Sequence, residues 1–299
     1  MSKLVIVGTI GLDDVETPFG KVSGALGGSA AYASIAASFF NKSAVVSIVG
    51  NDMPKKNLAV LHSRNIDLKE LVFSDKNFRW SGRYEFDMNE AKTLKTELNS
   101  LADFNPKISS RSAKSEFLFV ANIDPDIQIK VINQMTNTPF IVLDTMNFWI
   151  NNKKKSLLKA MSKADLIVVN EAEARQIFDT ANLISAGKQL LKMGPKYAVI
   201  KKGEHGALLF SENCFFSAPG FPLETVKDPT GAGDSFAGGL IGYISKAAKI
   251  NADTIRRGVI YGSAIASFCA EDFSANYIKK VQLLDIKERY NVFKEIRRF

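Results

Sequence analysis

The sequence has little of what disulfide-bonded, zinc-dependent or membrane-spanning proteins need. Its 299 residues include two cysteines, Cys214 and Cys269, and two histidines, His62 and His205. Two cysteines cannot form a disulfide framework, and so few Cys and His residues argue against a zinc centre. No apolar run approaches the roughly 18 residues of a membrane span, and the start carries no recognisable secretory signal. We therefore expect a cytoplasmic protein with no membrane partner.

The sequence also lacks a segment in which charge of one sign is concentrated. The formal net charge is +8, from 39 Lys and Arg against 31 Asp and Glu. The basic residues are scattered, and Lys153–Lys155 is the only run of three. No basic stripe is interleaved with aromatic residues, so we expect solvated surface charge and no nucleic-acid partner. The composition, 46% hydrophobic and 23% charged, is that of a globular protein.

Short β-branched runs alternate with helical segments along the chain. Several runs are apolar throughout, which is typical of strands buried on both faces of a parallel sheet. The alternating order predicts an α/β fold, a doubly wound, mostly parallel sheet with helices on both faces. The expected strands are Leu4–Gly8, Ala44–Gly50, Phe117–Ala121, Phe140–Asp144, Leu166–Asn170 and Tyr197–Lys201, with a late hairpin from Ala207–Phe210 and Cys214–Ser217. The expected helices are Gly28–Phe40, Met53–Arg64, Asp126–Asn137, Lys153–Ser162, Glu171–Phe178, Asn182–Met193, Gly231–Lys249, Ala252–Ala270 and a last one from about Val281.

One segment breaks this rhythm. In Phe78–Asn99, apolar Trp80, Tyr84, Phe86 and Met88 alternate with polar residues, which predicts a strand with one apolar face and a return strand. With the turn-rich stretch near 14–25, this segment predicts a small β-strand lid. We expect one domain, 1–299, with lid segments inserted at about 14–25 and 73–103. An apolar strand face needs a cover, so a homodimer through the lid is one possibility.

The strongest chemical signal is the segment DPTGAGDSF, residues 228–236, followed by small residues. Gly231 and Gly233 allow unusual backbone angles and a close approach of ligand to main chain. The free N–H groups of the helix that follows favour an anion. Asp234 at this helix start is either a plain N-cap or a general base beside a transferring phosphoryl group. A P-loop, a protein-kinase motif set and a dinucleotide fingerprint are all absent from the sequence.

This segment resembles the C-terminal signature of the ribokinase-like (PfkB) carbohydrate kinases. Further elements resemble that family in the same order along the chain. They are the di-glycine motif in Leu26–Ala30 (LGGSA), the first-strand aspartate Asp13 after Gly8, the N-x-x-E element Asn170 and Glu173, and the nucleotide-side turn in Lys202–Ala207 (KGEHGA).

The resemblance implies an ATP-dependent kinase that phosphorylates a hydroxymethyl group of a sugar or sugar derivative. Asp234 would be the catalytic base, and the N–H groups of Gly231, Ala232 and Gly233 would form the anion hole. The other implied roles are substrate binding by Asp13, Gly27 and Gly28, ATP binding by Lys202, Gly203, Gly206 and Thr230, Mg²⁺ binding by Asn170 and Glu173, and a contribution of Asp228 to a monovalent-cation (K⁺) site. For Asn170 and Glu173, a capping box at a helix start is the alternative.

Two features leave the substrate open. Tyr32 stands where many sugar kinases of the family have a substrate-binding Asn, so its ring either stacks on a base or fills the core. Arg83 in the lid either binds substrate or is solvated. Lys201, next to Lys202, could also face ATP phosphates, whereas Asp144 follows a strand and is explained equally well by turn capping. The alternatives are therefore a nucleoside kinase acting on a 5′-hydroxyl and a ligand-binding protein without turnover.

Overall fold

A nine-stranded sheet organises the chain, of which the computed structural model describes residues 3–298. The strand order is β13-β12-β11-β10-β9-β8-β1-β4-β5, and all neighbours are parallel except β11–β12 and β12–β13, which are antiparallel. The expected fold class is thereby confirmed. The strands are β1 (Leu4–Val7), β4 (Ser43–Gly50), β5 (Asp67–Ser74), β8 (Phe117–Val120), β9 (Phe140–Asp144), β10 (Leu166–Asn170), β11 (Tyr197–Lys201), β12 (Ala207–Ser211) and β13 (Cys214–Ala218).

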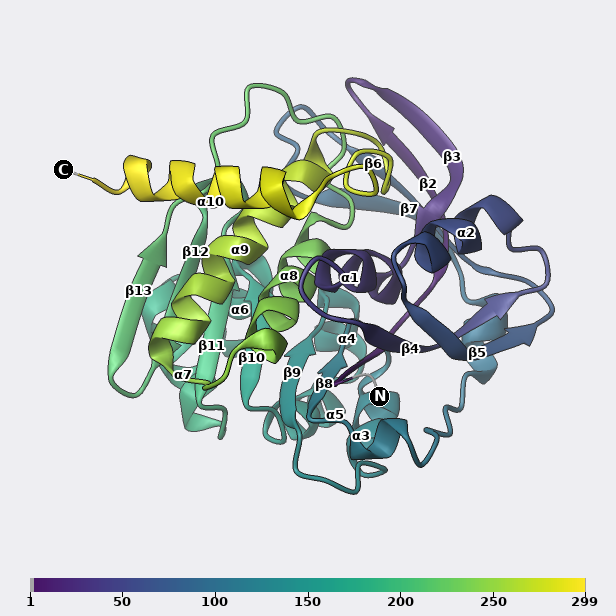
Figure 1. Ribbon diagram of the computed structural model, residues 1–299, viewed down its shortest axis with the longest axis horizontal. Helices are drawn as coiled ribbons and strands as arrows, with labels where there is room; N and C mark the ends of the chain where they lie inside the picture. The colour runs from purple at the N-terminus through teal and green to yellow at the C-terminus, as the bar shows by residue number, and fades with distance from the viewer. Residues whose placement is uncertain (1–2, 299) are drawn as a thin grey trace.

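Helices cover both faces of this sheet (Figure 1). Because neighbouring strand residues point to opposite faces, Leu4 and Ile6 enter one core cluster while Val5 and Val7 enter the other. The first cluster is covered by α1 (Ser29–Ala37), α2 (Lys55–Ser63), α8 (Ala232–Lys246), α9 (Ala252–Ala270) and α10 (Leu283–Ile296). The second is covered by α3 (Pro125–Ile132), α4 (Asn147–Asn152), α5 (Lys154–Met161), α6 (Glu171–Phe178) and α7 (Leu183–Lys192). Short 3₁₀ turns are η1 (Asn99–Asp103), η2 (Ser112–Lys114) and η3 (Gly203–His205).

A separate four-stranded sheet lies beside the carboxyl end of the large one (Figure 1). Its order is β3-β2-β6-β7, with β2 and β6 parallel and the outer pairs antiparallel. The strands are β2 (Gly11–Thr17), β3 (Gly20–Gly27), β6 (Phe78–Tyr84) and β7 (Ala91–Glu97), and we call them the small sheet. They come from the two regions where the sequence predicted strands outside the main rhythm.

Small residues bring α1 and α8 close together. A Cβ at Gly238 would lie 2.3 Å from the Ala33 carbonyl oxygen, and one at Gly242 would lie 2.7 Å from the Cα of Ala37. Larger residues at these positions would push the helices apart. The two helix starts, where the di-glycine motif and the glycine turn stand, are therefore fixed relative to each other by close backbone packing.

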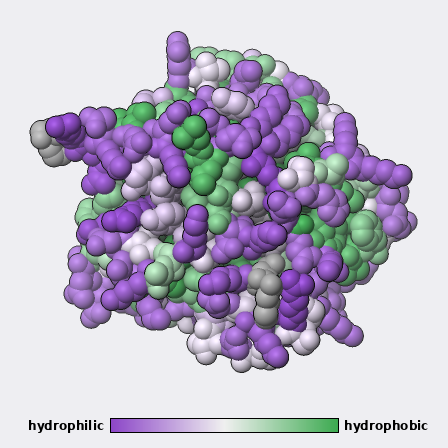
Figure 2. All heavy atoms as spheres, viewed as in Figure 1, coloured by the Kyte–Doolittle hydropathy of each residue, from purple (hydrophilic) through white to green (hydrophobic). Residues whose placement is uncertain are grey.

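Some elements differ from the sequence-based expectation. Strand β5 and helix α4 were not predicted. For β5 the reason is that most residues of this edge strand are only partly buried and its sequence, DLKELVFS, lacks a clear apolar run. The apolar alternation beyond β6 is not a strand, since β6 ends at Tyr84 and Phe86 is 90% exposed. Figure 2 shows a mainly hydrophilic face with apolar side chains gathered over β4 and β5, where Val72 and Phe73 are exposed. No helix within residues 3–298 is long and apolar enough to cross a membrane.

Candidate active site

Three neighbouring strands end in polar side chains at the same edge of the large sheet. Asp144, Asn170 and Lys201 are the last residues of β9, β10 and β11, which lie side by side. In open α/β sheets, ligands bind beyond the carboxyl ends of the strands. Helix α8 starts at the same place, because a Cβ at Gly233 would lie 3.1 Å from the Nζ of Lys201. Carboxylate, amide and ammonium groups therefore meet a helix N-terminus there.

The glycine turn before α8 depends on the packing of Tyr32. Gly231 has a φ of 76°, in the left-handed region that favours glycine, and a Cβ there would lie 2.5 Å from the Tyr32 ring. The turn is closed by the Ala232 N–H, which donates to the carbonyl of Pro229 over 3.0 Å. An anion at this helix start would therefore have to share the Ala232 N–H with the Pro229 carbonyl. Gly233 is the next residue of the first helical turn.

Asp234 lies in the first turn of α8. Burial raises the pKa of Asp234 to about 7, the Asp144 carboxylate adds to the shift, and the Lys201 ammonium opposes it. A carboxyl group with a pKa near the working pH is ionised often enough to accept a proton and is basic enough to hold it. The position and the pKa both fit a general base. The alternative, a plain N-cap, is wrong, because the N-cap of α8 is Gly231 and no side chain caps this helix start.

The di-glycine motif makes room for the buried carboxyl group of Asp13. Asp13 is 4% exposed, and a Cβ at Gly27 would lie 2.1 Å from its carboxyl. Gly28 has a φ of 97°, and its N–H donates to the Asp13 carboxylate. Burial raises the pKa of Asp13 to about 8, with Asp228, Asp234 and Asp14 adding to the shift. The charge of Asp234, in the first turn of α8, therefore acts on Asp13.

Asp228 and Thr230 shape the loop before the helix. The buried Asp228 carboxylate accepts the Thr230 N–H (2.9 Å) and the Ser274 N–H (3.0 Å). Burial raises its pKa above the ordinary value, while those donors oppose the shift. The Thr230 hydroxyl donates to the Tyr84 hydroxyl over 3.3 Å. Because Tyr84 belongs to β6, the small sheet is tied directly to the glycine turn.

Asn170 and Glu173 form the capping box that was the alternative to a metal role. The Glu173 N–H donates to Asn170 Oδ1 and the Asn170 N–H donates to Glu173 Oε2, each over 2.7 Å. Glu173 is nevertheless 5% exposed, and burial raises its pKa to about 8. Within residues 3–298, no three His, Cys, Asp or Glu side chains converge as a metal-binding group. These two residues therefore do not make a complete direct coordination shell.

A cavity of about 460 Å³ lies beside this edge of the large sheet. Gly203, Gly206 and Asn170 line it as the sequence leads one to expect, and Lys201 and Gly233 do so too. The walls that sequence reasoning missed come from distant segments. They include Met88 at the tip of the β6–β7 hairpin, Phe221 and Pro222 in a loop, and Ser263 and Ser267 on α9. The small-residue spacing of Ser263 and Ser267, four apart on one helix face, is the only signal that could have indicated them.

Of the two lysines predicted to face ATP phosphates, one lines this cavity. Lys201, at the end of β11, lines it, whereas Lys202 does not. The Lys202 N–H donates to the carbonyl of Gly206 and closes the turn around η3. Lys202 thus shapes the turn through its main chain, and the ammonium group in the cavity belongs to Lys201.

For two residues with open roles, Tyr32 and Arg83, the structure favours the alternative to a substrate contact. Tyr32 is 2% exposed and belongs to the core beside Gly231, so its ring fills the core. The Arg83 side chain is 51% exposed and pairs with Glu16 over 3.0 Å. It is a surface ion pair between β6 and β2, not a group aimed at the cavity.

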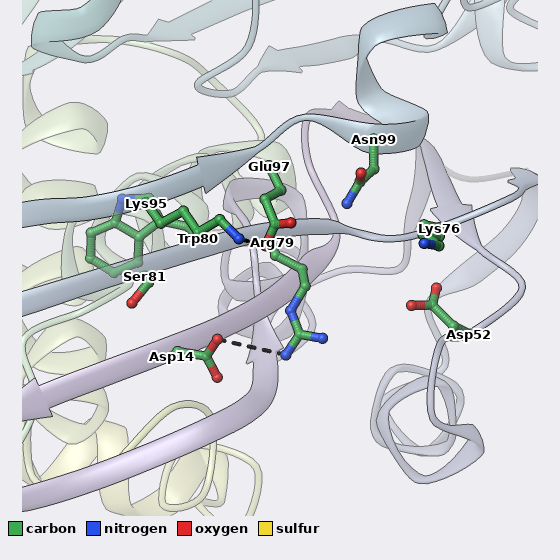
Figure 3. Close-up of a pocket in the computed structure, with 9 residues that line it drawn as sticks. All are labelled: Asp14, Asp52, Lys76, Arg79, Trp80, Ser81, Lys95, Glu97 and Asn99. Carbon is green, nitrogen blue, oxygen red and sulfur yellow. Dashed lines mark ion pairs between the residues drawn. The ribbon is translucent and has the colours of Figure 1, made fainter.

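A second cavity, of about 470 Å³, is lined by small-sheet residues, among them Asp14 and Arg79, and by Asp52 and Lys76 (Figure 3). Asp14 points to the opposite face from Asp13 because it follows Asp13 on the same strand. Its carboxylate pairs with Arg79 over 3.6 Å, and Lys95 pairs with Glu97 over 3.2 Å. The charges on this face are therefore paired with one another beside the Trp80 side chain. A homodimer stays a prediction.

The two acidic groups with raised pKa values give a testable pH dependence. Asp13 and Asp234 must both be ionised to accept hydrogen bonds or a proton, and their pKa values are about 8 and about 7. The value of kcat/KM for an acceptor should therefore be highest above pH 8 and fall as the pH decreases through 8 and 7. Since the groups interact, the acid limb reports apparent values of the pair. A profile that stays flat down to pH 5 would contradict this assignment, and Asp13→Asn is the control that should leave a single lower transition.

Comparison with known proteins identifies similar chains. A family model described as pfkB family carbohydrate kinase matches residues 11–280. Cytidine kinase of Thermococcus kodakarensis is 28% identical over 250 residues, which cover 81% of this chain and 89% of that protein. Fructokinase-2 of Zea mays is 31% identical over 121 residues, or 39% of this chain and 35% of that protein. The crystal structure of fructokinase from Vibrio cholerae O395, with fructose, ADP and calcium ion bound, has a TM-score of 0.79 at 19% identity and covers 97% of this chain and 99% of that one.

Proposed function

The chain belongs to the pfkB family of carbohydrate kinases, and on that premise we propose that it transfers the γ-phosphoryl group of ATP to a hydroxymethyl group of a sugar or nucleoside. One observation carries the proposal. The Asp234 carboxylate, with a pKa raised to about 7, stands in the first turn of α8, and its charge helps to raise the pKa of Asp13. A phosphoryl donor on one side and a hydroxyl acceptor on the other would meet at this carboxylate.

The cavity of about 460 Å³ is the proposed ATP site. Its apolar wall of Phe221, Pro222 and Ala266 suits a base, while Gly203 and Gly206 allow a close approach of the main chain. The phosphates would point toward Gly233 and the start of α8, where helix N–H groups and the helix dipole favour negative charge. Thr230, immediately before the glycine turn, would contribute its hydroxyl once released from Tyr84.

The acceptor would lie between Asp13 and Asp234. The Asp13 carboxylate can accept hydrogen bonds from two neighbouring hydroxyls, as a sugar or ribose diol offers. Asp234 would take the proton of the attacking hydroxyl as the new oxygen–phosphorus bond forms and the bond to ADP breaks. Gly27 and Gly28 would let the acceptor approach the main chain. Proton removal by a positioned base accelerates a reaction by about 10²–10⁴-fold.

Asn170 and Glu173 fit a hydrated magnesium ion. Their side-chain oxygens suit a hard cation. Their mutual capping hydrogen bonds leave too few oxygen ligands for a full direct coordination shell, which suits an ion that keeps its water ligands. When bound with ATP, Mg²⁺ would neutralise phosphate charge. For a potassium ion, the Asp228 carboxylate fits less well than its main-chain carbonyl, since both carboxylate oxygens already accept N–H groups.

The small sheet is proposed to act as a lid within a single domain. The Tyr84–Thr230 hydrogen bond and the position of Met88 in the cavity wall support this role, because the sheet touches both the glycine turn and the nucleotide cavity. A lid that closes on substrate excludes water and limits wasteful hydrolysis. The lid strands would be those at 11–27 and 78–97.

A nucleoside is the second candidate acceptor, and one finding favours it. The similarity to the cytidine kinase extends over 81% of this chain, whereas that to the maize fructokinase extends over 39%. The hydroxymethyl group of a ribonucleoside would present the same chemistry to Asp13 and Asp234 as that of a sugar. The rest of the acceptor, either a nucleoside base or further hydroxylated carbons, would then determine which acceptor binds.

We expect one acceptor class to stimulate ADP release from Mg-ATP. The measurement is coupled ADP formation with a panel of pentoses, hexoses, sugar acids, and pyrimidine and purine ribonucleosides, followed by mass analysis of the product. Turnover with nucleosides alone supports the second candidate, and turnover with free sugars alone supports the first. Equal ADP release with and without every acceptor, and no phosphorylated product, would overturn the kinase proposal.

A further inference from the structure

Lys201 has a setting that neither the family signature nor the capping residues account for. Its Nζ lies 3.3 Å from Asp144 Oδ2 and 3.5 Å from Oδ1, and its side chain is 15% exposed. The same Nζ would be 3.1 Å from a Cβ at Gly233. The ammonium group therefore stands between the end of β9 and the first turn of α8, facing the nucleotide cavity that it lines.

We propose that Lys201 is a catalytic residue whose ammonium group contacts the oxygens of the transferred γ-phosphoryl group, and that Asp144 is a positioning residue that holds it there. The inference rests on the proposed phosphoryl transfer and adds to it a fixed cation supplied by the chain itself. Lysine is suited to this role as a compact point charge with three donors.

The charges around Lys201 require such a cation. Asp144, Glu173 and Asp234 all interact electrostatically with it, and the first two are almost fully buried. Their negative charge outweighs the burial of the ammonium group, so the pKa of Lys201 lies above its ordinary value and the side chain stays protonated. Without this cation, the negative charge of Asp144 and Asp234 would repel the phosphates of a nucleotide. A positive charge in a water-poor site stabilises developing phosphoryl charge more than it would in water.

Asp144 is well placed to orient this ammonium group. It is 2% exposed, it ends β9, and its Oδ1 accepts the Thr145 N–H over 2.9 Å. The carboxylate is thereby fixed by its own strand end, and the lysine bound to it loses rotational freedom before any ligand arrives. Pre-positioning of a charged group lowers the cost of ordering it during the reaction.

The step balances without a proton from Lys201. The acceptor hydroxyl gives its proton to Asp234, its oxygen forms the bond to the γ-phosphorus, and the bond between that phosphorus and the β–γ bridging oxygen breaks to release ADP. Lys201 remains an ammonium ion throughout and donates hydrogen bonds to the phosphoryl oxygens while their charge redistributes.

The competing explanation is that Lys201 only neutralises buried Asp144. The double variant Lys201→Met, Asp144→Asn separates the two roles, because it removes both charges of the pair. Replacing both members of a buried pair by neutral groups is usually tolerated, whereas removing one leaves the other unpaired. Under the structural explanation, the double variant regains activity. Under our proposal, it folds and stays impaired.

The test compares wild type, Lys201→Met, Asp144→Asn and the double variant in the Mg-ATP assay with the active acceptor. We expect Lys201→Met and the double variant to lose about 10²–10³ in kcat, the scale for removing one preorganised donor. Asp144→Asn should lower kcat while the KM of the acceptor stays unchanged, and it should cost nothing further once Lys201 is methionine. Lys196→Met is the matched control, since Lys196 forms an exposed pair with Asp165 just before the other end of β11.

The outcomes separate this inference from the proposed function. Thermal unfolding and ATP binding establish that each variant is folded. An active wild type with a double variant within threefold of its kcat would overturn the role of Lys201 and leave the kinase proposal standing. An inactive wild type across the whole panel would overturn the proposed function itself, and this inference with it. A folded, ATP-binding double variant that stays about 10²-fold impaired supports the proposal.

Discussion

Asp234→Asn is expected to lower kcat by about 10²–10⁴ while the chain stays folded and binds ATP. Asparagine has nearly the shape of aspartate but cannot accept the proton of the acceptor hydroxyl. Its amide can still occupy the first turn of α8, where Asp234 stands, so the helix start should persist. Losing one of the carboxylates around Lys201 also lowers repulsion toward phosphate, so ATP binding should be kept or slightly strengthened.

The measurement pairs steady-state kinetics with ATP binding by calorimetry and thermal unfolding. A binding protein without turnover would show no change in acceptor-dependent ADP release, because it has none to lose. Asp14→Asn is a useful comparison, since Asp14 neighbours Asp13 but pairs with Arg79 on the other face of the small sheet. We expect that variant to retain most of its kcat. Near-wild-type turnover in Asp234→Asn would refute the assignment of the base.

Most strands of the large sheet, and the glycine turn, could be predicted from the sequence because each depends on a local pattern. Continuous apolar runs such as LIVVN mark strands buried on both faces, and such strands in turn place Asn170 at the carboxyl edge. The glycine turn is equally local, because small residues and a following helix are visible in nine consecutive positions. Strand β5 was missed for the opposite reason: its residues face solvent along much of the strand, so no apolar pattern marks them.

The side-chain positions that the sequence left open depend on packing between distant segments. Lys201 and Lys202 are adjacent, and only the end of β11 decides which ammonium enters the cavity. Tyr32 lies one helical turn into α1, but its burial is decided by Gly231, 199 positions later, against which its ring packs. The cavity wall joins Met88, Phe221 and Ser267 from three separate segments. No sequence spacing connects them.

Gly231→Ala is expected to disable the site and to destabilise the fold together. Its φ of 76° is costly for alanine, by about 1–2 kcal/mol, and the new methyl would lie 2.5 Å from the Tyr32 ring. Overpacking of a filled core costs about 1–3 kcal/mol more. Either the ring or the turn must move, and because Asp234 lies three residues further on, a moved turn displaces the base. We expect a drop of about 10²-fold or more in kcat, the scale at which a misplacement near 1 Å acts.

Gly233→Ala is the matched variant that separates an effect on activity from an effect on the stability of the fold. Gly233 has no left-handed φ, and its new methyl would meet only the flexible end of Lys201, at 3.1 Å. This variant should keep the unfolding temperature of wild type while it loses activity, because the methyl intrudes where phosphate and the ammonium group would meet. Gly231→Ala should lose both. If Gly231→Ala instead kept both the unfolding temperature and kcat, the glycine turn would be neither packed against Tyr32 nor needed in its left-handed form, and the proposed anion site at the start of α8 would lose its structural basis.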